Sequence, residues 1–445
     1  MSPHARPTAI ALRRWRPGAF AWAAAALVFA VSAVLQIVGV PGTSSFGTRT
    51  RFDLDVYRLG GALWQQGISL YADGSLPFTQ DGIWLPFTYP PFAALLFTPL
   101  GAIPLGIAGI GLSVVSIACL VYVTVVFLRL LGIGHPGNRV LLALVISAAT
   151  VWFNPFGMTL SFGQVNVILL VLIVVDLFVV RPDGPLRGTL IGLASAVKLT
   201  PLVFLGVFAA SGRWRAAWVG VGAFVSAGLI AAAWLPADSA KYWSYTVFHT
   251  TRIGVPEGPI NQNLNAAWLR LLGVDNPAAP AAWVISALVV TALAAVALWR
   301  SRPSESFGPA PTPRDDVNAL IAACIVAFWG LLVAPTTWSH HWVWSLPAVL
   351  ACLTIGVATR DRLGGRLFGL LGVVGIPIFA IGPFQLMPED VTAWSWWQQI
   401  AGNAYLLWAL GFLLLLAVKP FRIADDGPAV TPTDAADPAA ERRGR

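Results

Sequence analysis

The chain has 445 residues, of which 57% are hydrophobic and only 11% charged, and its formal net charge is +8. Apolar runs long enough to cross a bilayer recur along the whole sequence, which excludes a soluble globular protein and predicts a polytopic membrane protein. The basic residues lie mostly in short loops between these runs. They therefore indicate how the helices are oriented in the membrane, and they do not indicate nucleic-acid binding.

Ten apolar runs are predicted to be full membrane spans. They cover residues 20–40, 106–130, 140–158, 164–181, 216–235, 281–299, 317–335, 342–358, 365–382 and 401–418. Two further stretches, 90–104 and 188–210, contain prolines, and the second also contains Lys198. We expect residues 188–210 to form a re-entrant hairpin or two short helices broken at Pro201. The predicted fold is all-α, with about 10–12 transmembrane or re-entrant helices.

Basic residues flank alternate loops, and this pattern places both termini in the cytoplasm. These residues are Arg13, Arg14, Arg16, Arg181, Arg187, Arg213, Arg215, Arg300, Arg302, Arg314, Arg360, Arg362, Arg366, Lys419 and Arg422. Residues 1–19 are predicted to be a cytoplasmic segment, 20–420 the membrane domain, and 421–445 a disordered cytoplasmic tail. The long loops 41–89 and 237–280 then face outside, carry short interfacial helices, and place any chemistry on that side.

The first outer loop contains the octapeptide Arg51-Phe-Asp-Leu-Asp-Val-Tyr-Arg58, with two carboxylates and two guanidinium groups. In one interpretation these charges only solvate a helix end. In the other, Asp53 or Asp55 is held at the membrane–water boundary beside the arginines and acts as a base or a cation clamp. The residues themselves leave both interpretations open.

Three further polar positions occur where an apolar run begins or is interrupted. Tyr89 precedes two prolines, at a position where an aromatic ring favours the membrane interface. Gln164 and Asn166 stand at the outer start of a span, where they could cap a helix or bind sugar hydroxyls. Lys198 lies inside an apolar stretch, so its ammonium must either reach the cytoplasmic headgroups or bind a partner such as a lipid phosphate.

Residues 259–273 are predicted to form an amphipathic helix in the outer interface. Asn261, Gln262, Asn263 and Asn265 stand at its start, which is more amide groups than one helix cap requires. They could hydrogen-bond a ligand or the protein itself.

His340 and His341 stand at the outer end of a later span, among tryptophans typical of an interfacial belt. Adjacent histidines there could bind phosphate, relay a proton or ligate a metal. No carboxylate or cysteine lies nearby at ligand spacing, so a metal site is not expected.

In this order, the motifs resemble those of glycosyltransferase family 87. These are polytopic GT-C-type enzymes that include actinobacterial polyprenyl-phosphate-mannose-dependent α-1,2-mannosyltransferases. The resemblance covers about residues 20–420, and it depends on the order and spacing of short elements. The elements are Asp53-Leu-Asp-Val-Tyr57, Gly67 with Leu70-Tyr71, Tyr89-Pro-Pro91, Gly163-Gln-Val-Asn166, Lys198-Leu-Thr-Pro201, Asn261-Gln-Asn263 and Ser339-His-His-Trp342.

This resemblance implies a multi-pass plasma-membrane enzyme whose active site faces the periplasm. The donor would be a polyprenyl-phosphate mannose that enters from the bilayer. The acceptor would be phosphatidylinositol mannoside or lipomannan, joined through an α-1,2 linkage with inversion at the anomeric carbon. The family's first-loop aspartate is the general base, and Asp53 matches it best, with Asp55 as second choice. No cofactor or metal is expected.

The same resemblance implies a set of groups that bind the donor phosphate or the substrates. Among these, His340, His341, Arg58 and Lys198 are candidates to stabilise the charge of the departing phosphate. The full predicted set is Arg58, Tyr89, Gln164, Asn166, Lys198, Asn261, Gln262, Asn263, His340 and His341.

Two alternatives stay open at this stage. A lipid-linked sugar flippase or transporter would also explain an intramembrane Lys198 and broken helices, although the two halves of the chain show no inverted repeat. A pentosyltransferase that uses the same lipid carrier would share every motif above.

Overall fold

The structure is a computed structural model that describes residues 15–39, 51–72, 74, 76–80, 82–249, 254–301 and 313–418, without the side chains of 313–315. The described residues form helices and no strand, and an isolated antiparallel bridge joins Asn261 to Trp338. The predicted all-α polytopic class is therefore confirmed. The predicted tail at 421–445 and most of the segment 1–19 lie outside the described residues.

Seven helices in the described ranges are long and apolar enough to cross a bilayer. Two bent pairs raise the number of spans to nine if each pair is one span. The seven are α2 (Ala19–Val38), α5 (Leu105–Leu130), α11 (Trp214–Trp234), α14 (Ala278–Arg300), α15 (Pro313–Val333), η5 (Ser339–Trp344) continued by α16 (Ser345–Ala358), and α17 (Leu363–Ile381). The bent pairs are α6 (Pro136–Thr150) with α7 (Asn154–Phe162), and α18 (Trp396–Gly402) with α19 (Ala404–Val418).

The remaining elements are shorter. Four of them lie in apolar stretches: α4 (Pro91–Gly101), α8 (Asn166–Phe178), α9 (Thr189–Val197), and η2 (Thr200–Phe204) continued by α10 (Leu205–Ala210). The others lie in the connections between the spans: α3 (Phe52–Leu63), η1 (Trp64–Gln66), α12 (Pro236–Ser244), η3 (Thr246–Phe248), α13 (Leu264–Leu272), η6 (Pro383–Leu386) and η7 (Val391–Ala393).

Three predicted spans differ from the structure. The run 140–158 is not one straight helix, because it breaks between α6 and α7 with a bend of 77°. The run 164–181 contains only the 13-residue helix α8, about 20 Å long and therefore too short to cross the hydrocarbon core. The run 401–418 starts one helix earlier, since α18 meets α19 at 72°.

The stretch 188–210 forms two short helices, which was one of its two predicted forms. The break falls at Lys198, whose backbone is extended (φ −149°, ψ 129°), and not at Pro201. Pro201 instead occupies the first turn of η2, where its missing N–H costs nothing. The chain is therefore extended at the one charged residue of an apolar stretch.

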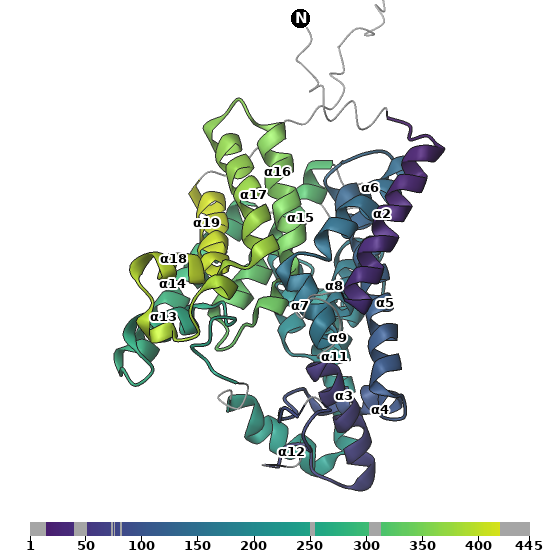
Figure 1. The fold of residues 1–445 in the computed structure, drawn as a ribbon, viewed down its shortest axis with the longest axis vertical. Helices are drawn as coiled ribbons and strands as arrows, with labels where there is room; N and C mark the ends of the chain where they lie inside the picture. Colours follow the sequence, from purple (N-terminus) through teal and green to yellow (C-terminus); the bar gives the residue numbers. More distant parts are fainter. Residues whose placement is uncertain are drawn as a thin grey trace, which may run out of the picture.

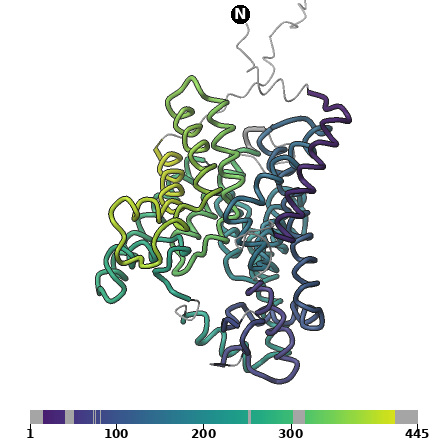
Figure 2. Tube along the Cα trace, in the orientation of Figure 1, coloured from purple at the N-terminus to yellow at the C-terminus, as the bar shows by residue number. Residues whose placement is uncertain are grey.

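Different elements lie at the two ends of the helical bundle (Figure 1). The start of α2 and the connection between α16 and α17 lie at one end, whereas α3, α4 and α12 lie at the other. The trace in Figure 2 shows a second division, with the C-terminal helices at the left and the N-terminal ones at the right. The polar site described below begins at α3.

Candidate active site

A cavity of about 1050 Å³ lies between α3, the start of η5 and the loops that follow α12 and α17. Its wall is mixed, with aromatic rings, three histidines, an ammonium and several carboxylates. Of the twelve residues predicted to act in catalysis or binding, six line it: Asp53, Tyr89, Gln164, Lys198, His340 and His341.

Helix α3 separates the two candidate bases. Asp53 and Asp55 are two residues apart, which is about 200° around a helix. Asp53 is partly exposed and lines the cavity. Asp55 is buried, with Oδ1 2.7 Å from Nη1 of Arg58 and Oδ2 accepting a hydrogen bond from the Gln80 backbone N–H at 2.8 Å. Helical geometry thus places Asp53 on the cavity wall, whereas Asp55 pairs with Arg58 and Gln80 away from it.

Arg58 is not part of the cavity wall in the described structure, contrary to its predicted contact with donor phosphate. Besides its ion pair with Asp55, its Nε donates to the Ile103 carbonyl at 2.8 Å. Both bonds fix the guanidinium between α3 and the loop after α4. Arg58 therefore holds α3 in place, and a role in phosphate binding has no support from this geometry.

The carboxyl of Asp53 is held among polar groups inside a largely apolar wall. Burial raises its pKa to about 6, and hydrogen bonds with Gln164 and Tyr89 and the positive charge of Lys198 act in the opposite direction. A carboxylate with a pKa near neutrality is suited to general-base catalysis, because it is ionised at neutral pH and still accepts a proton readily.

Lys198 reaches into the cavity from the break between α9 and η2. Its Nζ donates to Asn166 Oδ1 at 3.0 Å and to Gln164 Oε1 at 3.3 Å, and it lies 3.1 Å from Nε2 of His341. An ammonium can only donate, so this imidazole nitrogen is the acceptor. The ammonium therefore does not extend to the cytoplasmic headgroups.

Gln164 and Asn166 come from the sharp turn between α7 and α8. Gly163 there has φ +69°, and a Cβ at this position would lie 2.6 Å from Leu54 Cβ, so glycine lets the turn pack on α3. Gln164 Oε1 accepts from the Tyr57 hydroxyl at 2.8 Å, and Asn166 Nδ2 donates to the His340 carbonyl at 2.8 Å. Neither side chain caps α8, so the capping interpretation is wrong.

The sequence motif contained Tyr57, but we had not predicted a role for it. Tyr57 lies four residues after Asp53, hence on the same face of α3. Its hydroxyl also lies 3.2 Å from that of Tyr89, and burial raises the pKa of both phenols. The two hydroxyls therefore stay protonated. The Tyr57 hydroxyl donates to Gln164, whereas Tyr89 hydrogen-bonds the carboxyl of Asp53.

His340 and His341 start the span η5–α16 at the cavity wall. The His340 ring packs edge-on against Phe162, with centroids 5.3 Å apart, and its two nitrogens have no hydrogen-bond partner in the described part of the chain. The predicted role of His340 in binding a substrate stays a prediction. Within the described ranges no three His, Cys, Asp or Glu side chains gather to hold a metal, and the predicted independence of a metal stays a prediction.

The amides of Asn261, Gln262 and Asn263 are buried, but they do not line the cavity in the described structure. Their side chains donate to backbone carbonyls: Asn261 to Pro256, Gln262 to Pro259 and Gly402, and Asn263 to Ala334. Asn263 also caps α13 through Ala266 N. These amides join the outer loops to one another, and their predicted role as substrate ligands has no support from this arrangement.

Arg270 on α13 fastens the same loops and was not anticipated from the sequence. Its Nη1 donates to the carbonyls of Glu257, Gly258 and Asn261 at 2.9–3.1 Å. Its Nη2 donates to Asn403, and its guanidinium lies 5.5 Å from the ring centre of Trp394. The wall segment that contains Glu257 is thus tied to the start of α19.

Arg270→Met should lower the free energy of unfolding by about 3 kcal/mol, because several buried acceptors would lose their donor. Thermal unfolding in detergent measures the change. Arg360→Met is the matched control, since Arg360 is exposed and only pairs with Asp361 at 4.0 Å. Equal unfolding midpoints for the two variants would contradict the role of Arg270 in holding these loops together.

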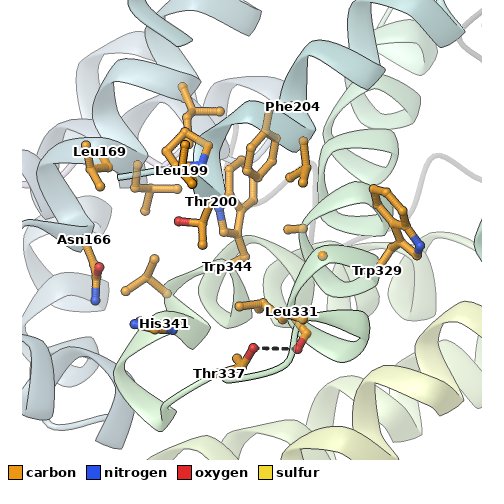
Figure 3. Close-up of a pocket in the computed structure, with 18 of the residues that line it drawn as sticks. Asn166, Leu169, Leu199, Thr200, Phe204, Trp329, Leu331, Thr337, His341 and Trp344 are labelled. Carbon is orange, nitrogen blue, oxygen red and sulfur yellow. Dashed lines mark hydrogen bonds between the residues drawn. The ribbon is translucent and has the colours of Figure 1, made fainter. Parts of the chain in front are cut away.

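A second, apolar pocket of about 310 Å³ adjoins the cavity (Figure 3). Figure 3 shows Asn166 and His341 on one side of it, and the stacked rings of Phe204 and Trp344 deeper in. Most of its remaining wall is aliphatic. Four residues line both spaces: Leu199, Thr200, Ala334 and His341. The cavity that contains Asp53 and Lys198 and this apolar pocket therefore meet along a shared wall that includes His341.

The fold and this site define a multi-pass membrane protein in which a cavity with a carboxylate and an ammonium adjoins an apolar pocket. A family model described as glycosyltransferase family 87 matches residues 87–335. The chain belongs to this family and is a membrane glycosyltransferase. The flippase alternative is not favoured.

Relatives extend the match beyond that range. The chain is 36% identical to a polyprenol-phosphate-mannose-dependent alpha-(1-2)-phosphatidylinositol mannoside mannosyltransferase of Mycobacterium tuberculosis, over 83% of this chain and 84% of the relative. It is 33% identical to a protein of the same description from Mycolicibacterium smegmatis, over 86% and 89% of the two chains. A phosphatidylinositol pentamannoside mannosyltransferase of M. tuberculosis is 29% identical over 84% of each chain. No solved structure matches significantly.

Proposed function

We propose that this enzyme transfers mannose from polyprenyl-phosphate mannose to a mannosylated phosphatidylinositol lipid and forms an α-1,2 linkage. The relatives' descriptions support the donor and the acceptor class. The observation that carries the proposal is the junction of two spaces at His341. The apolar pocket suits a prenyl chain, the groups around Lys198 suit its phosphate, and the larger cavity that contains Asp53 suits the sugar.

The reaction is a single displacement at the anomeric carbon. Asp53 takes the proton of the acceptor hydroxyl while the oxygen of that hydroxyl bonds to the anomeric carbon. At the same time the bond between this carbon and the phosphate oxygen breaks. The electron pair leaves with the polyprenyl phosphate, and a β-mannosyl phosphate becomes an α-mannoside. Lys198 and the adjacent histidines stabilise the phosphate charge in a site where solvent screening is weak. Gln164 and Tyr89, which hydrogen-bond the carboxyl of Asp53, orient it.

We further propose that the active site faces the periplasm and that both described chain ends lead into the cytoplasm. The alternation of basic loops supports this orientation. Arg360 and Arg362 lie in the connection between α16 and α17, at the end of the bundle opposite α3. A cysteine placed at exposed Asp275 should then react with a membrane-impermeant maleimide in intact cells, whereas one placed at Asp361 should not.

Transfer by purified protein in detergent tests the function directly. Radiolabelled polyprenyl-phosphate mannose and a phosphatidylinositol mannoside should give a lipid product that α-1,2-mannosidase digests. Donor movement across liposomes without any product would instead support a flippase. If product forms only from a polyprenyl-phosphate pentose, the enzyme is a pentosyltransferase, and the proposed displacement at the anomeric carbon still holds.

The rate should depend on pH through Asp53. The base must be ionised, and burial raises its pKa from 3.8 to about 6. Activity should therefore be full at neutral pH and fall as pH drops through about 6, not through 4 as for an exposed aspartate. The donor phosphodiester keeps its single negative charge over this pH range, so its ionisation does not contribute to the pH profile. A kcat/KM profile that is flat between about pH 5 and 8 would contradict the assignment.

A further inference from the structure

We propose that Trp338 and Glu257 form the subsite that binds the terminal sugar of the acceptor. This inference rests on the proposed function, since it assigns the acceptor half of the same cavity. Both residues line the cavity, and neither was singled out as a ligand from the sequence. The ligand class is a neutral pyranose whose hydroxyl is presented to Asp53.

The backbone of Trp338 is held firmly next to the reacting groups. Asn261 and Trp338 pair in an antiparallel bridge, with Gln262 N donating to Thr337 O and Ser339 N to Ile260 O, each at 2.8 Å. Trp338 therefore sits two residues before His340 in a fixed backbone, and its partly exposed indole forms part of the cavity wall.

Gly254 makes room for this indole. It has φ +102°, and a Cβ there would lie 3.1 Å from the Trp338 ring, so a side chain would press on the ring. One part of the ring is thus covered by the loop backbone while the residue stays partly open to the cavity. A flat, partly covered aromatic surface beside a reacting centre suits the C–H face of a sugar ring.

Glu257 supplies the complementary polar contact. Its Oε2 is buried and accepts no hydrogen bond from the described residues, whereas its backbone carbonyl is held by Arg270. A buried carboxylate oxygen without a donor is costly, and a carboxylate can only accept. Sugar hydroxyls are the donors that a glycolipid acceptor would bring to this position.

The distribution of charge separates the two substrates. Lys198 stands beside Asp53, whereas Glu257, Glu389 and Asp390 line the wall formed by the later outer loops. Three carboxylates repel an anionic group, so the donor phosphate is favoured near Lys198 and disfavoured near Glu257. An acceptor must therefore present a neutral sugar here and keep its own phosphodiester outside, as a lipid with several sugars can.

The test measures acceptor and donor affinities separately in purified full-length protein. Trp338→Ala and Glu257→Gln should each raise the KM for phosphatidylinositol mannoside by about 10- to 100-fold, with the donor KM changed less than about twofold. Trp338→Phe, which keeps an apolar ring, should restore most of the affinity. Trp397→Ala and Asp275→Asn, both exposed and outside the cavity wall, should leave both KM values unchanged.

Each outcome decides between the subsite and the underlying function. An unchanged acceptor KM in Trp338→Ala and Glu257→Gln, with active wild-type enzyme, would overturn the subsite alone. A donor KM that rises in parallel would also overturn it, because the residues would then act on the whole cavity. If the wild-type protein transfers no mannose to any mannolipid, the proposed function fails first, and the inference with it.

Discussion

Asp53→Asn should lower kcat for mannosyl transfer by about 10²–10⁴-fold, the range for loss of a general base. Asparagine keeps the shape of the side chain and can still bond with Gln164 and Tyr89, but it cannot accept the acceptor's proton. The donor KM should change little, because Asp53 acts on the other substrate. Initial rates with radiolabelled donor, at saturating acceptor, measure the effect.

The fold of this variant should survive. The pKa of Asp53 is higher in the folded chain than the ordinary value, about 6 against 3.8. The folded state therefore binds more protons between these values, and its stability falls as pH rises through this window. At neutral pH the ionised Asp53 destabilises the protein, and asparagine removes that cost. An unfolding midpoint at or above that of the wild type, together with lost activity, is the expected signature.

Asp55→Asn is the matched control two residues away. It loses the ion pair with Arg58, which is held at 2.7 Å and is largely buried. We expect a lower unfolding midpoint and a much smaller loss of kcat per folded molecule than for Asp53→Asn. The opposite pattern, with Asp55→Asn folded and inactive and Asp53→Asn active, would transfer the role of the base to Asp55.

These two aspartates show what the sequence could predict and what it could not. Their place after the first span and their motif were evident, and so was the membrane class. The choice between them required knowing that the segment is helical from Phe52 and which face of that helix meets the cavity. The cost of an ammonium in an apolar stretch likewise indicated that Lys198 needs partners, without identifying them.

The amide cluster shows the limit more sharply. Asn261 and Asn263 lie close together in sequence, but their partners Thr337 and Ala334 are more than 70 residues away. Local composition therefore could not distinguish amides that bind a substrate from amides that hydrogen-bond one loop to another. For the same reason it could not predict the contact between Arg270 and Asn403. Hydropathy predicted where apolar helices run, but not the 77° bend between α6 and α7, because a bend leaves composition unchanged.

Lys198→Met should lower kcat/KM by about 10²–10³-fold, as expected when one preorganised donor to a developing negative charge is removed. Methionine fills a similar volume in the apolar surroundings, so the loss should be chemical and not a packing defect. Lys198→Arg should not restore the rate. The ammonium is held by Gln164, Asn166 and His341 within 3.0–3.3 Å, and a planar guanidinium cannot occupy that position with the same three contacts.

Two further measurements separate this role from simple loss of folding. Lys241→Met on α12, outside the cavity wall, should retain wild-type rates and shows what removing a lysine does by itself. The double variant Asp53→Asn, Lys198→Met should be hardly slower than the slower single variant, because proton removal and phosphate departure belong to one displacement. An active and folded Lys198→Met would show that another group stabilises the leaving phosphate. Full additivity of the two losses would show that Asp53 and Lys198 act independently and not in one displacement.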